Sequence, residues 1–163
     1  MSFNLPANLD PAISHVVETA IPMVGLNVKS NDMLAPVAFV GSASGLKIVL
    51  LSLKDEKDKE ETTTLLRDLC KKNKATFVLL AMESWSLSDP VAVEDFIANR
   101  DRYPSISTHP AAVECVFFNL ETLKHGSYSA SALIQPGREL AEVSFVRGGV
   151  KGRLVNILPI RLL

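Results

Sequence analysis

Apolar residues recur at helical spacing near the start of the chain. Asp10-Pro11 is typical of a helix start, because the carboxylate can cap the first turn and proline fits the first helical position. The apolar residues that follow are mostly three or four positions apart: Ile13, Val16, Val17, Ala20 and Val24. We predict a helix over about residues 11–21 that Pro22 ends or kinks.

Two further segments carry helix signals. After the mixed charge run of residues 54–61, an apolar stripe leads into a group of lysines, which the negative end of a helix dipole favours. The stripe consists of Leu65, Leu66, Leu69 and Cys70. Asp89-Pro90 again combines a capping carboxylate with a proline. We predict an amphipathic helix that ends near residues 71–74 and a short helix that begins near residue 90.

Three segments rich in β-branched and large aliphatic residues predict strands. Residues 36–40 and 46–53 flank the Gly- and Ser-rich residues 41–45, which predicts a hairpin with a loop of three to five residues. The second arm and residues 75–84 are apolar on both faces, so we expect both to lie centrally in a sheet that is covered on both sides. Because a helix precedes residues 75–84, that strand is the one expected to have a parallel neighbour, reached by a crossover.

The last third of the chain predicts an antiparallel meander. Pairing outward from the Pro-Gly turn at residues 136–137 sets Ile134 opposite Glu139 and Tyr128 opposite Phe145 on one face. Serines then occupy the other face of the hairpin, which we expect to be mostly exposed. A slip of one residue in the pairing would bury the serines and expose the aromatic rings.

The predicted elements form one α+β domain over residues 1–163. In chain order they are a helix, a hairpin, a helix, a strand, a short helix with a loop, and four strands joined by turns. The first of those four strands is expected at residues 113–120 and the last at about 153–158. This order predicts a single mixed, mostly antiparallel sheet of six or seven strands with two or three helices packed on it.

The charge balance argues against some partners. The 163 residues include 17 Lys and Arg and 18 Asp and Glu, a formal net charge of -1, so no overall positive field exists to gather nucleic acid or an anionic membrane. With 47% hydrophobic and 21% charged residues, the chain has the composition of a folded protein rather than a disordered one. We therefore expect neither nucleic-acid binding nor membrane binding.

The cysteines and the first residues indicate the expected compartment. Cys70 and Cys115 lie among apolar residues without a CxxC motif or Cys/His ligand spacing, which predicts no zinc site and no disulfide framework. The first six residues lack the basic and apolar regions of a signal peptide, so we expect a cytoplasmic protein. No cofactor fingerprint is present, and the cofactor stays unknown at this point.

Glu83, Trp85, His109 and Glu114 are the first candidate site residues. Glu83 and Trp85 share a face at the end of a predicted central strand, where sheets often bind ligands. His109 and Glu114 follow across the next loop, so two carboxylates and an imidazole are placed to converge on a divalent metal or to exchange protons. The competing interpretation is structural, with Glu114 paired to an arginine. Cys115 beside His109 would resemble an activated thiol, but its apolar neighbours favour a buried structural cysteine.

The connection over residues 99–110 carries a second candidate group. Arg100 and Arg102 fit a carboxylate or phosphate ligand, because a guanidinium matches both, and Tyr103 follows directly. Asp101 partly cancels the positive field of the arginines. Simple solvation of the two arginines is the alternative.

The apolar end of the chain, residues 155–163, predicts an interface. The mean hydropathy of +0.20 is high for a small monomer. We expect a homo-oligomer that forms through this segment or through an edge strand covered by a partner. Packing of the segment onto its own core is the alternative.

Two functions from different classes follow from these residues. The lack of a dense catalytic cluster favours a non-enzymatic, self-associating domain that binds a partner or small ligand in a cleft formed by Trp85 and the loop around Tyr103 and His109. The alternative is a metal-dependent hydrolase or nuclease with Glu83, His109 and Glu114 as metal ligands.

Overall fold

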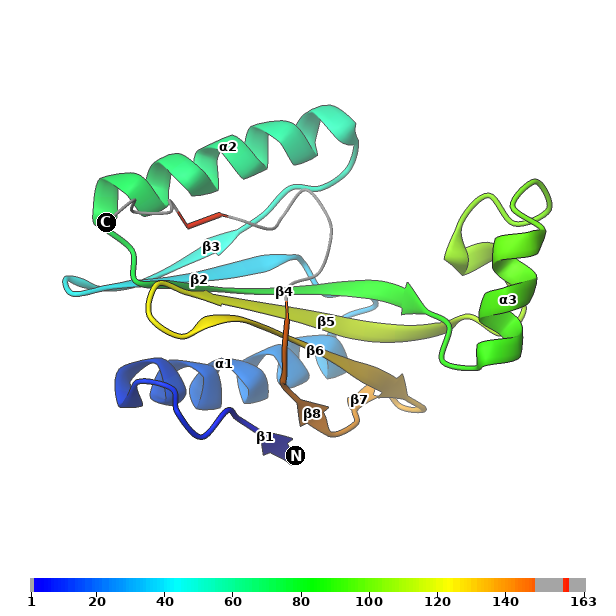
Figure 1. Ribbon diagram of the computed structural model, residues 1–163, viewed down its shortest axis with the longest axis horizontal. Coiled ribbons are helices and arrows are strands. Elements are labelled where there is room, and N and C mark those ends of the chain that lie inside the picture. The colour runs from blue at the N-terminus through cyan, green and yellow to red at the C-terminus, as the bar shows by residue number, and fades with distance from the viewer. Residues whose placement is uncertain (1, 149–156, 159–163) are drawn as a thin grey trace.

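The computed structural model describes residues 2–148 and 157–158, and its main body has three layers (Figure 1). Two long helices, α1 and α2, cover opposite faces of a sheet, and α3 lies beyond one end of that sheet. The helices are α1 (Pro11–Ser30), α2 (Glu56–Asn73) and α3 (Pro90–Ala98), with a single 3-10 turn, η1 (Ile106–Thr108). The strands are β1 (Phe3–Asn4), β2 (Val37–Ser42), β3 (Gly45–Leu50), β4 (Phe77–Ser86), β5 (Val113–Thr122), β6 (Gly126–Gln135), β7 (Glu139–Leu140), β8 (Val143–Ser144) and β9 (Val146–Arg147).

The strands confirm the predicted α+β class. The larger sheet has seven strands in the order β3-β2-β4-β5-β6-β7, with β9 also paired to β6, and all of its described pairs are antiparallel. β1 and β8 form a separate small sheet, which is parallel. The parallel neighbour predicted for β4 is therefore wrong. β4 does run in the direction of β3, but β2 lies between the two strands and pairs with both in antiparallel fashion.

Helix α1 continues well past the end predicted at Pro22. The Asp10 carboxylate accepts a hydrogen bond from the Ala12 N–H, as expected for a cap, and the helix ends only at Ser30. Proline removes one helical N–H, but Val24 and Val28 beyond it are 2% and 0% exposed. Burial of this second apolar stretch outweighs the missing bond, so the predicted end at residue 21 is wrong.

Helix α2 and helix α3 form where the sequence predicts them. The Asp55 carboxylate caps α2 at the Asp58 N–H, and Lys74 ends it in the left-handed conformation, with a φ of 51°. The Asp89 carboxylate caps α3 at the Val91 N–H. The Asp89 cap is the one that the sequence predicts, whereas α2 is predicted from its apolar stripe and its lysines, and its Asp55 cap is a finding of the structure.

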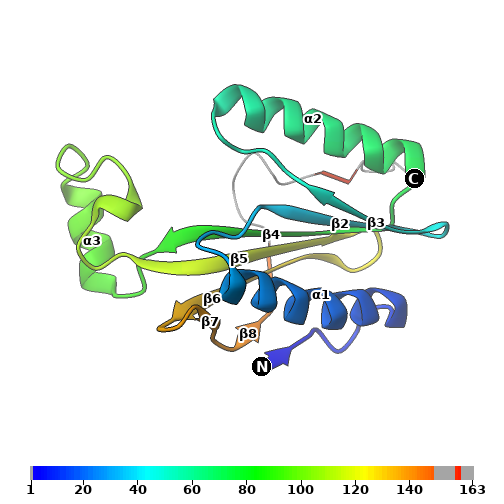
Figure 2. The same cartoon turned by 180° about the vertical axis from the view of Figure 1, so that it is seen from behind.

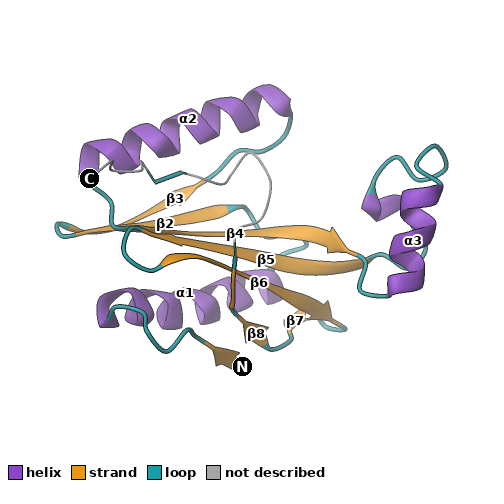
Figure 3. Ribbon diagram, viewed as in Figure 1, coloured by secondary structure: helices purple, strands orange, loops and turns teal. Residues whose placement is uncertain are grey.

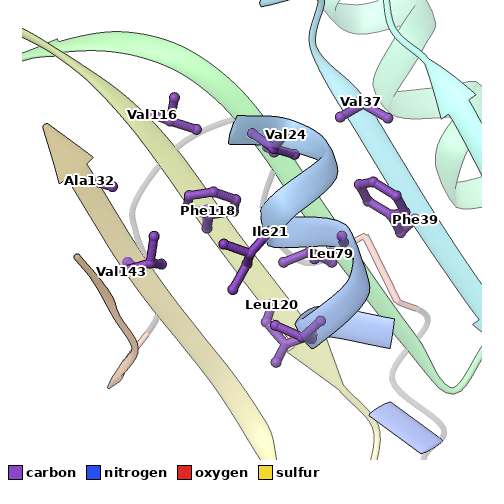
Figure 4. Packing of buried hydrophobic residues seen from close by; sticks show 14 of the residues in the cluster. Ile21, Val24, Val37, Phe39, Leu79, Val116, Phe118, Leu120, Ala132 and Val143 are labelled. Atoms are coloured by element: carbon purple, nitrogen blue, oxygen red, sulfur yellow. The ribbon is translucent and has the colours of Figure 1, made fainter. Parts of the chain in front are cut away.

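Each face of the sheet has its own apolar core. On the α1 side, Figure 4 shows Ile21 and Val24 of the helix packed over Phe39, Leu79 and Phe118 of the central strands. On the α2 side, the buried residues that contact one another are Ala38, Val40, Leu51, Leu66, Cys70, Ala75, Val78, Leu80, Ile157 and Leu158. The sheet is therefore covered on both faces in its middle, as the apolar runs of β2 and β4 require.

Strand β3 lies at the edge of the sheet and not in its centre. Leu46, Ile48 and Leu50 are 43%, 52% and 73% exposed, although the sequence predicts a central strand from them. The prediction fails because a run that is apolar on both faces indicates two covered faces, and only one side of β3 is covered here. Val49 packs against the α2-side core, whereas the three exposed side chains lie on the α1 side, opposite Gly41, Phe39 and Val37.

The lengths of the two hairpin turns differ from those predicted: the β2–β3 turn is shorter and the β6–β7 turn is one residue longer. The β2–β3 connection is a two-residue turn between the paired Ser42 and Gly45, which is shorter than the predicted loop. The β6–β7 turn has three residues, 136–138, between the paired Gln135 and Glu139. Gly137 and Arg138 take up positive φ values of 80° and 56° in this turn.

The additional residue in the β6–β7 turn shifts the predicted register of β6 and β7 by one residue. Ile134 pairs with Leu140 rather than Glu139, a shift of one residue, and Tyr128 pairs with Arg147 rather than Phe145, a shift of two residues. In β7 the predicted faces are wrong, because Leu140 and not Glu139 lies on the side of Ile134, whereas Tyr128 and Phe145 share a face as predicted, since both pack on the α1-side core. Residues 141 and 142 lie between β7 and β8, and this break restores the predicted alternation of buried and exposed side chains from Val143 onward. The final strand predicted at 153–158 lies outside the described residues except for 157 and 158.

The segment between β4 and β5 forms a separate projection, which we call the α3 lobe (residues 87–112). It contains α3, η1 and their connection, and it lies beyond the end of the sheet, at the tips of two long strands (Figures 2 and 3). Ser86 and Val113, which bound the lobe, are partners in the β4–β5 ladder. The long strands therefore hold the lobe away from the three-layer body.

Candidate functional site

Glu83 and Glu114 lie close together at the end of the sheet and share one arginine. Glu83 is near the end of β4 and Glu114 near the start of β5, on the α1 side of the sheet. The Arg138 guanidinium forms an ion pair with Glu83 through its Nη2, and its Nη1 lies 3.7 Å from Glu114 Oε2. The predicted structural alternative, in which an arginine neutralises Glu114, is therefore present in the structure.

The Arg138 cluster, consisting of Arg138, Glu83 and Glu114, also holds the end of α1. Arg138 Nε donates a hydrogen bond of 2.8 Å to the Val28 carbonyl oxygen near the helix end. Glu83 Oε1 accepts a second bond, of 2.8 Å, from the backbone N–H of Leu34. With the Glu83 side chain 15% exposed and that of Arg138 24% exposed, the pair is shielded from much of the solvent. The cluster joins α1, β4, β5 and the β6–β7 turn.

His109 belongs to a different cluster, inside the α3 lobe. Its Nε2 lies 3.0 Å from Asp95 Oδ2, and its Nδ1 accepts a 3.0 Å hydrogen bond from the Ala111 N–H. Because Nδ1 is an acceptor, the neutral ring carries its proton on Nε2 and donates it to Asp95. The other Asp95 oxygen accepts a bond from the Asn99 amide at 2.8 Å. Both polar ends of the imidazole are thus occupied.

The Tyr103 and His109 rings form the core of the α3 lobe. Their centroids are 4.6 Å apart, and the two residues are 7% and 8% exposed. The sequence predicts these rings as the lining of an open cleft, together with Trp85. Instead they are buried against each other, and Trp85 alone of the three is open to solvent, at 42% exposure.

The predicted metal-binding group is not assembled. Among residues 2–148 and 157–158, no group of three or more His, Cys, Asp and Glu side chains is arranged to hold a metal ion. The physical reason is competition for partners, because Arg138 takes Glu83 and Glu114 whereas Asp95 takes His109. Cys115 also lacks the predicted base, since its thiol donates to the Ser84 carbonyl at 3.5 Å and both His109 bonds go elsewhere.

Arg100 and Arg102 lie against aromatic rings of the α3 lobe. The Arg100 Cζ is 4.5 Å from the centroid of Phe96, and the Arg102 Cζ is 5.4 Å from that of Tyr103. Both arginines are exposed while both rings are buried. The guanidinium groups are therefore oriented by the lobe and are not simply solvated loop side chains.

Large apolar side chains are exposed over the same lobe and at its base. On α3, Val91 and Ile97 are 71% and 67% exposed, whereas Ala92 and Phe96 are buried. Helical geometry places Val91, Glu94 and Ile97 on the outer side of α3, away from that buried pair. The other exposed apolar residues here are Trp85 at 42%, Ile106 at 37% and Val113 at 37%.

A third polar group lies on the α2 side of the sheet. Glu121 is 6% exposed, and its Oε2 accepts bonds from the backbone N–H groups of Ile157 at 2.9 Å and Leu158 at 3.1 Å. Burial and the nearby Glu121 charge raise the pKa of the Cys70 thiol from 9.0 to about 11. Ile157 and Leu158 are 1% and 7% exposed, so this part of the apolar end packs onto its own core. The remainder of the end lies outside the described residues.

The sequence interpretation missed Arg138 and Asp95. Arg138 follows a Pro-Gly pair, which signals a turn and draws attention away from the charge beside it. Asp95 is one acidic residue of a short helix and carries no motif. The sequence offers one signal for Arg138: it is a basic residue in a turn, and two carboxylates without a predicted partner lie on adjacent strands.

Comparisons with known proteins leave the site to be interpreted from its own geometry. No protein-family model, curated protein sequence or solved structure matches the chain. The helices within the described part of the chain include none with the length and apolar character needed to cross a membrane.

Proposed function

We propose that this protein is a non-enzymatic, cytoplasmic binding domain that takes a protein partner on the outer surface of the α3 lobe. The observation that carries the proposal is the exposure of Trp85, Val91, Ile97 and Ile106 on and beside one projecting lobe. Apolar side chains that gather on an exposed surface are typical of protein interaction sites. Contacts made there would leave the three-layer body undisturbed.

The side-chain types on the lobe support a protein partner. Tryptophan and arginine are the residues that most often dominate the energy of protein interfaces, and Trp85, Arg100 and Arg102 are all exposed here. The cation–π contacts hold the two guanidinium groups in place while leaving them open to solvent. A partner with an apolar surface edged by carboxylates would complement this arrangement.

The inner packing of the lobe supports the same proposal. The hydrogen bond from His109 to Asp95, the bond that His109 accepts from the Ala111 N–H and the ring contact to Tyr103 fix the loop that follows α3. A surface that is already ordered loses less conformational entropy when it binds. The buried histidine is thus assigned a supporting role for the binding surface rather than a role in proton transfer.

Site-specific photo-crosslinking tests this proposal with a matched control. A photoreactive amino acid at Ile97, which is 67% exposed on α3, is compared with the same amino acid at Leu65, which is 69% exposed on α2. Cells that express either variant are irradiated, and crosslinked products are identified by mass spectrometry. We expect a discrete crosslinked protein from position 97 that is absent from position 65. The proposal fails if both positions give the same products or if position 97 gives none.

A further inference from the structure

We propose that two copies of the chain join β3 to β3 across a twofold axis and so extend the sheet through both molecules. β3 ends the strand order of the larger sheet, and no described strand pairs with its outer edge. The proposal does not depend on the partner assigned to the α3 lobe. It also differs from self-association through residues 155–163, because it uses the outer edge of β3 and none of those residues.

The backbone of β3 offers a regular set of hydrogen-bonding groups at that edge. The Leu51 N–H donates to the Pro36 carbonyl at 2.8 Å, and bonds to one neighbour alternate along an antiparallel strand. Odd-numbered residues of β3 therefore bond to β2. The N–H and C=O groups of Leu46, Ile48 and Leu50 point away from the sheet and are placed to bond to another strand.

The side chains of the same three residues form an apolar row. Leu46, Ile48 and Leu50 are 43%, 52% and 73% exposed, and all lie on the α1 side of the sheet. Edge strands of monomeric proteins are usually protected by proline, a bulge or several charges. β3 contains neither proline nor a bulge, and its single charged residue, Lys47, faces the α2 side.

The sequence of β3 fits a second copy of itself in one register. With the axis at Ile48, the two Ile48 side chains lie opposite each other, and Leu46 lies opposite Leu50 of the second copy. Each Lys47 then lies opposite Val49. Moving the axis to Lys47 would set two ammonium groups face to face, and moving it to Val49 would set Leu46 opposite a residue beyond the end of β3. Charge and pattern thus select the Ile48 axis.

Sedimentation equilibrium of the full chain tests this pairing. We expect a concentration-dependent dimer of twice the 17.7 kDa chain mass. Ile48→Lys and Ile48→Glu each place like charges at the axis and should raise the dimer dissociation constant at least about tenfold. An equimolar mixture of these two variants should recover dimer, because opposite charges then meet. Leu65→Lys, at an exposed apolar position on α2, should leave the dissociation constant unchanged.

Cysteine crosslinking tests the register. Leu46→Cys and Leu50→Cys variants are mixed under mild oxidation. The two native cysteines, Cys70 and Cys115, are buried and so are not placed to crosslink two chains. A disulfide-linked dimer should form in the mixture and not in either variant alone, since only residues 46 and 50 face each other. The proposal is overturned if the wild type stays a monomer, if Ile48→Lys dimerises as well as the wild type, or if the mixture gives no more crosslink than the single variants.

Discussion

Replacing Arg138 with methionine tests whether the Arg138 cluster holds the end of the sheet together. The change removes the guanidinium but keeps an apolar stem of similar length. It abolishes the ion pairs with Glu83 and Glu114 and the 2.8 Å bond to the Val28 carbonyl. The Glu83 carboxylate, 15% exposed, is then left with the Leu34 N–H as its remaining described hydrogen bond.

The expected loss of stability follows from the burial of this pair. Removing one partner of a fully buried ion pair costs about 3–5 kcal/mol, and partial solvent access lowers this to about 2 kcal/mol here. The lost bond to the helix carbonyl adds about 1 kcal/mol. We expect the free energy of unfolding to fall by about 3 kcal/mol and the Tm to fall by about 6–12 °C. Adding Glu83→Gln to Arg138→Met should recover about 1–2 kcal/mol of this loss, because the shielded unpaired carboxylate is then gone and the Glu114 carboxylate, whose side chain is 46% exposed, is hydrated.

Urea denaturation of the single and double variants measures these differences. Lys29→Met is the matched control, since it removes an ion pair to Glu139 whose side chains are 58% and 59% exposed. The hydrogen bond and charge of Glu139 raise the pKa of Lys29, but solvent screens such a pair and we expect no measurable change in stability. The reasoning is refuted if Arg138→Met is as stable as Lys29→Met, or if its effect and that of Glu83→Gln simply add.

Three further changes test other parts of the fold. Gly41→Ala should lower the free energy of unfolding by about 2 kcal/mol, measured by urea denaturation, because the new Cβ would lie 1.9 Å from the Phe77 ring. Because the pKa of the Cys70 thiol is raised from 9.0 to about 11, Cys70 should resist alkylation near pH 9. The stability that comes from keeping this thiol neutral is complete below pH 9 and is lost as the pH rises toward 11. This pH dependence of the free energy of unfolding should be absent in Cys70→Ala. Glu121→Gln should lower the free energy of unfolding by about 2 kcal/mol, measured in the same way, because two charge-assisted bonds to the backbone of residues 157 and 158 weaken.

A different result would contradict the prediction for each of these three positions, Gly41, Cys70 and Glu121. Combining Gly41→Ala with Phe77→Leu should reduce the penalty of the alanine, and equal penalties in both backgrounds would show that the ring is not the obstacle. Fast alkylation of Cys70 at pH 8 in a Cys115→Ala chain would contradict its burial. Unchanged stability in Glu121→Gln would show that the carboxylate does not hold residues 157 and 158.

Local signals in the sequence predict most of the helices and the meander because the relevant forces act between near neighbours. The capping carboxylates Asp10 and Asp89 mark two helix starts that the structure confirms. The end of α1 and the place of β3 depend on tertiary packing, which no local pattern carries. An apolar run looks the same whether its second face is covered by the chain itself or left exposed, and the sequence therefore predicts a central strand where the structure has the edge strand β3.

The partners of the candidate site residues also depend on tertiary packing that local sequence patterns do not carry. The sequence correctly places Glu83 and Glu114 at one end of the sheet, because strand alternation and chain order determine it. The partner of Glu83 is Arg138, 55 positions away in the sequence, and the partner of His109 is Asp95, 14 positions away. Arg138 is the third residue of a turn predicted with two residues, so the predicted pairing does not place it beside these carboxylates.

The α3 lobe leaves the sheet at Ser86 and returns at Val113, two residues that already sit side by side in the β4–β5 ladder. Its two ends therefore need no more than a tight turn to connect them, whatever lies between. Residues can therefore be inserted into, deleted from or replaced in the α3 lobe while β4 and β5 keep their pairing. A shortened chain with a two-residue turn in place of the lobe would be the natural starting scaffold for grafting a different recognition loop.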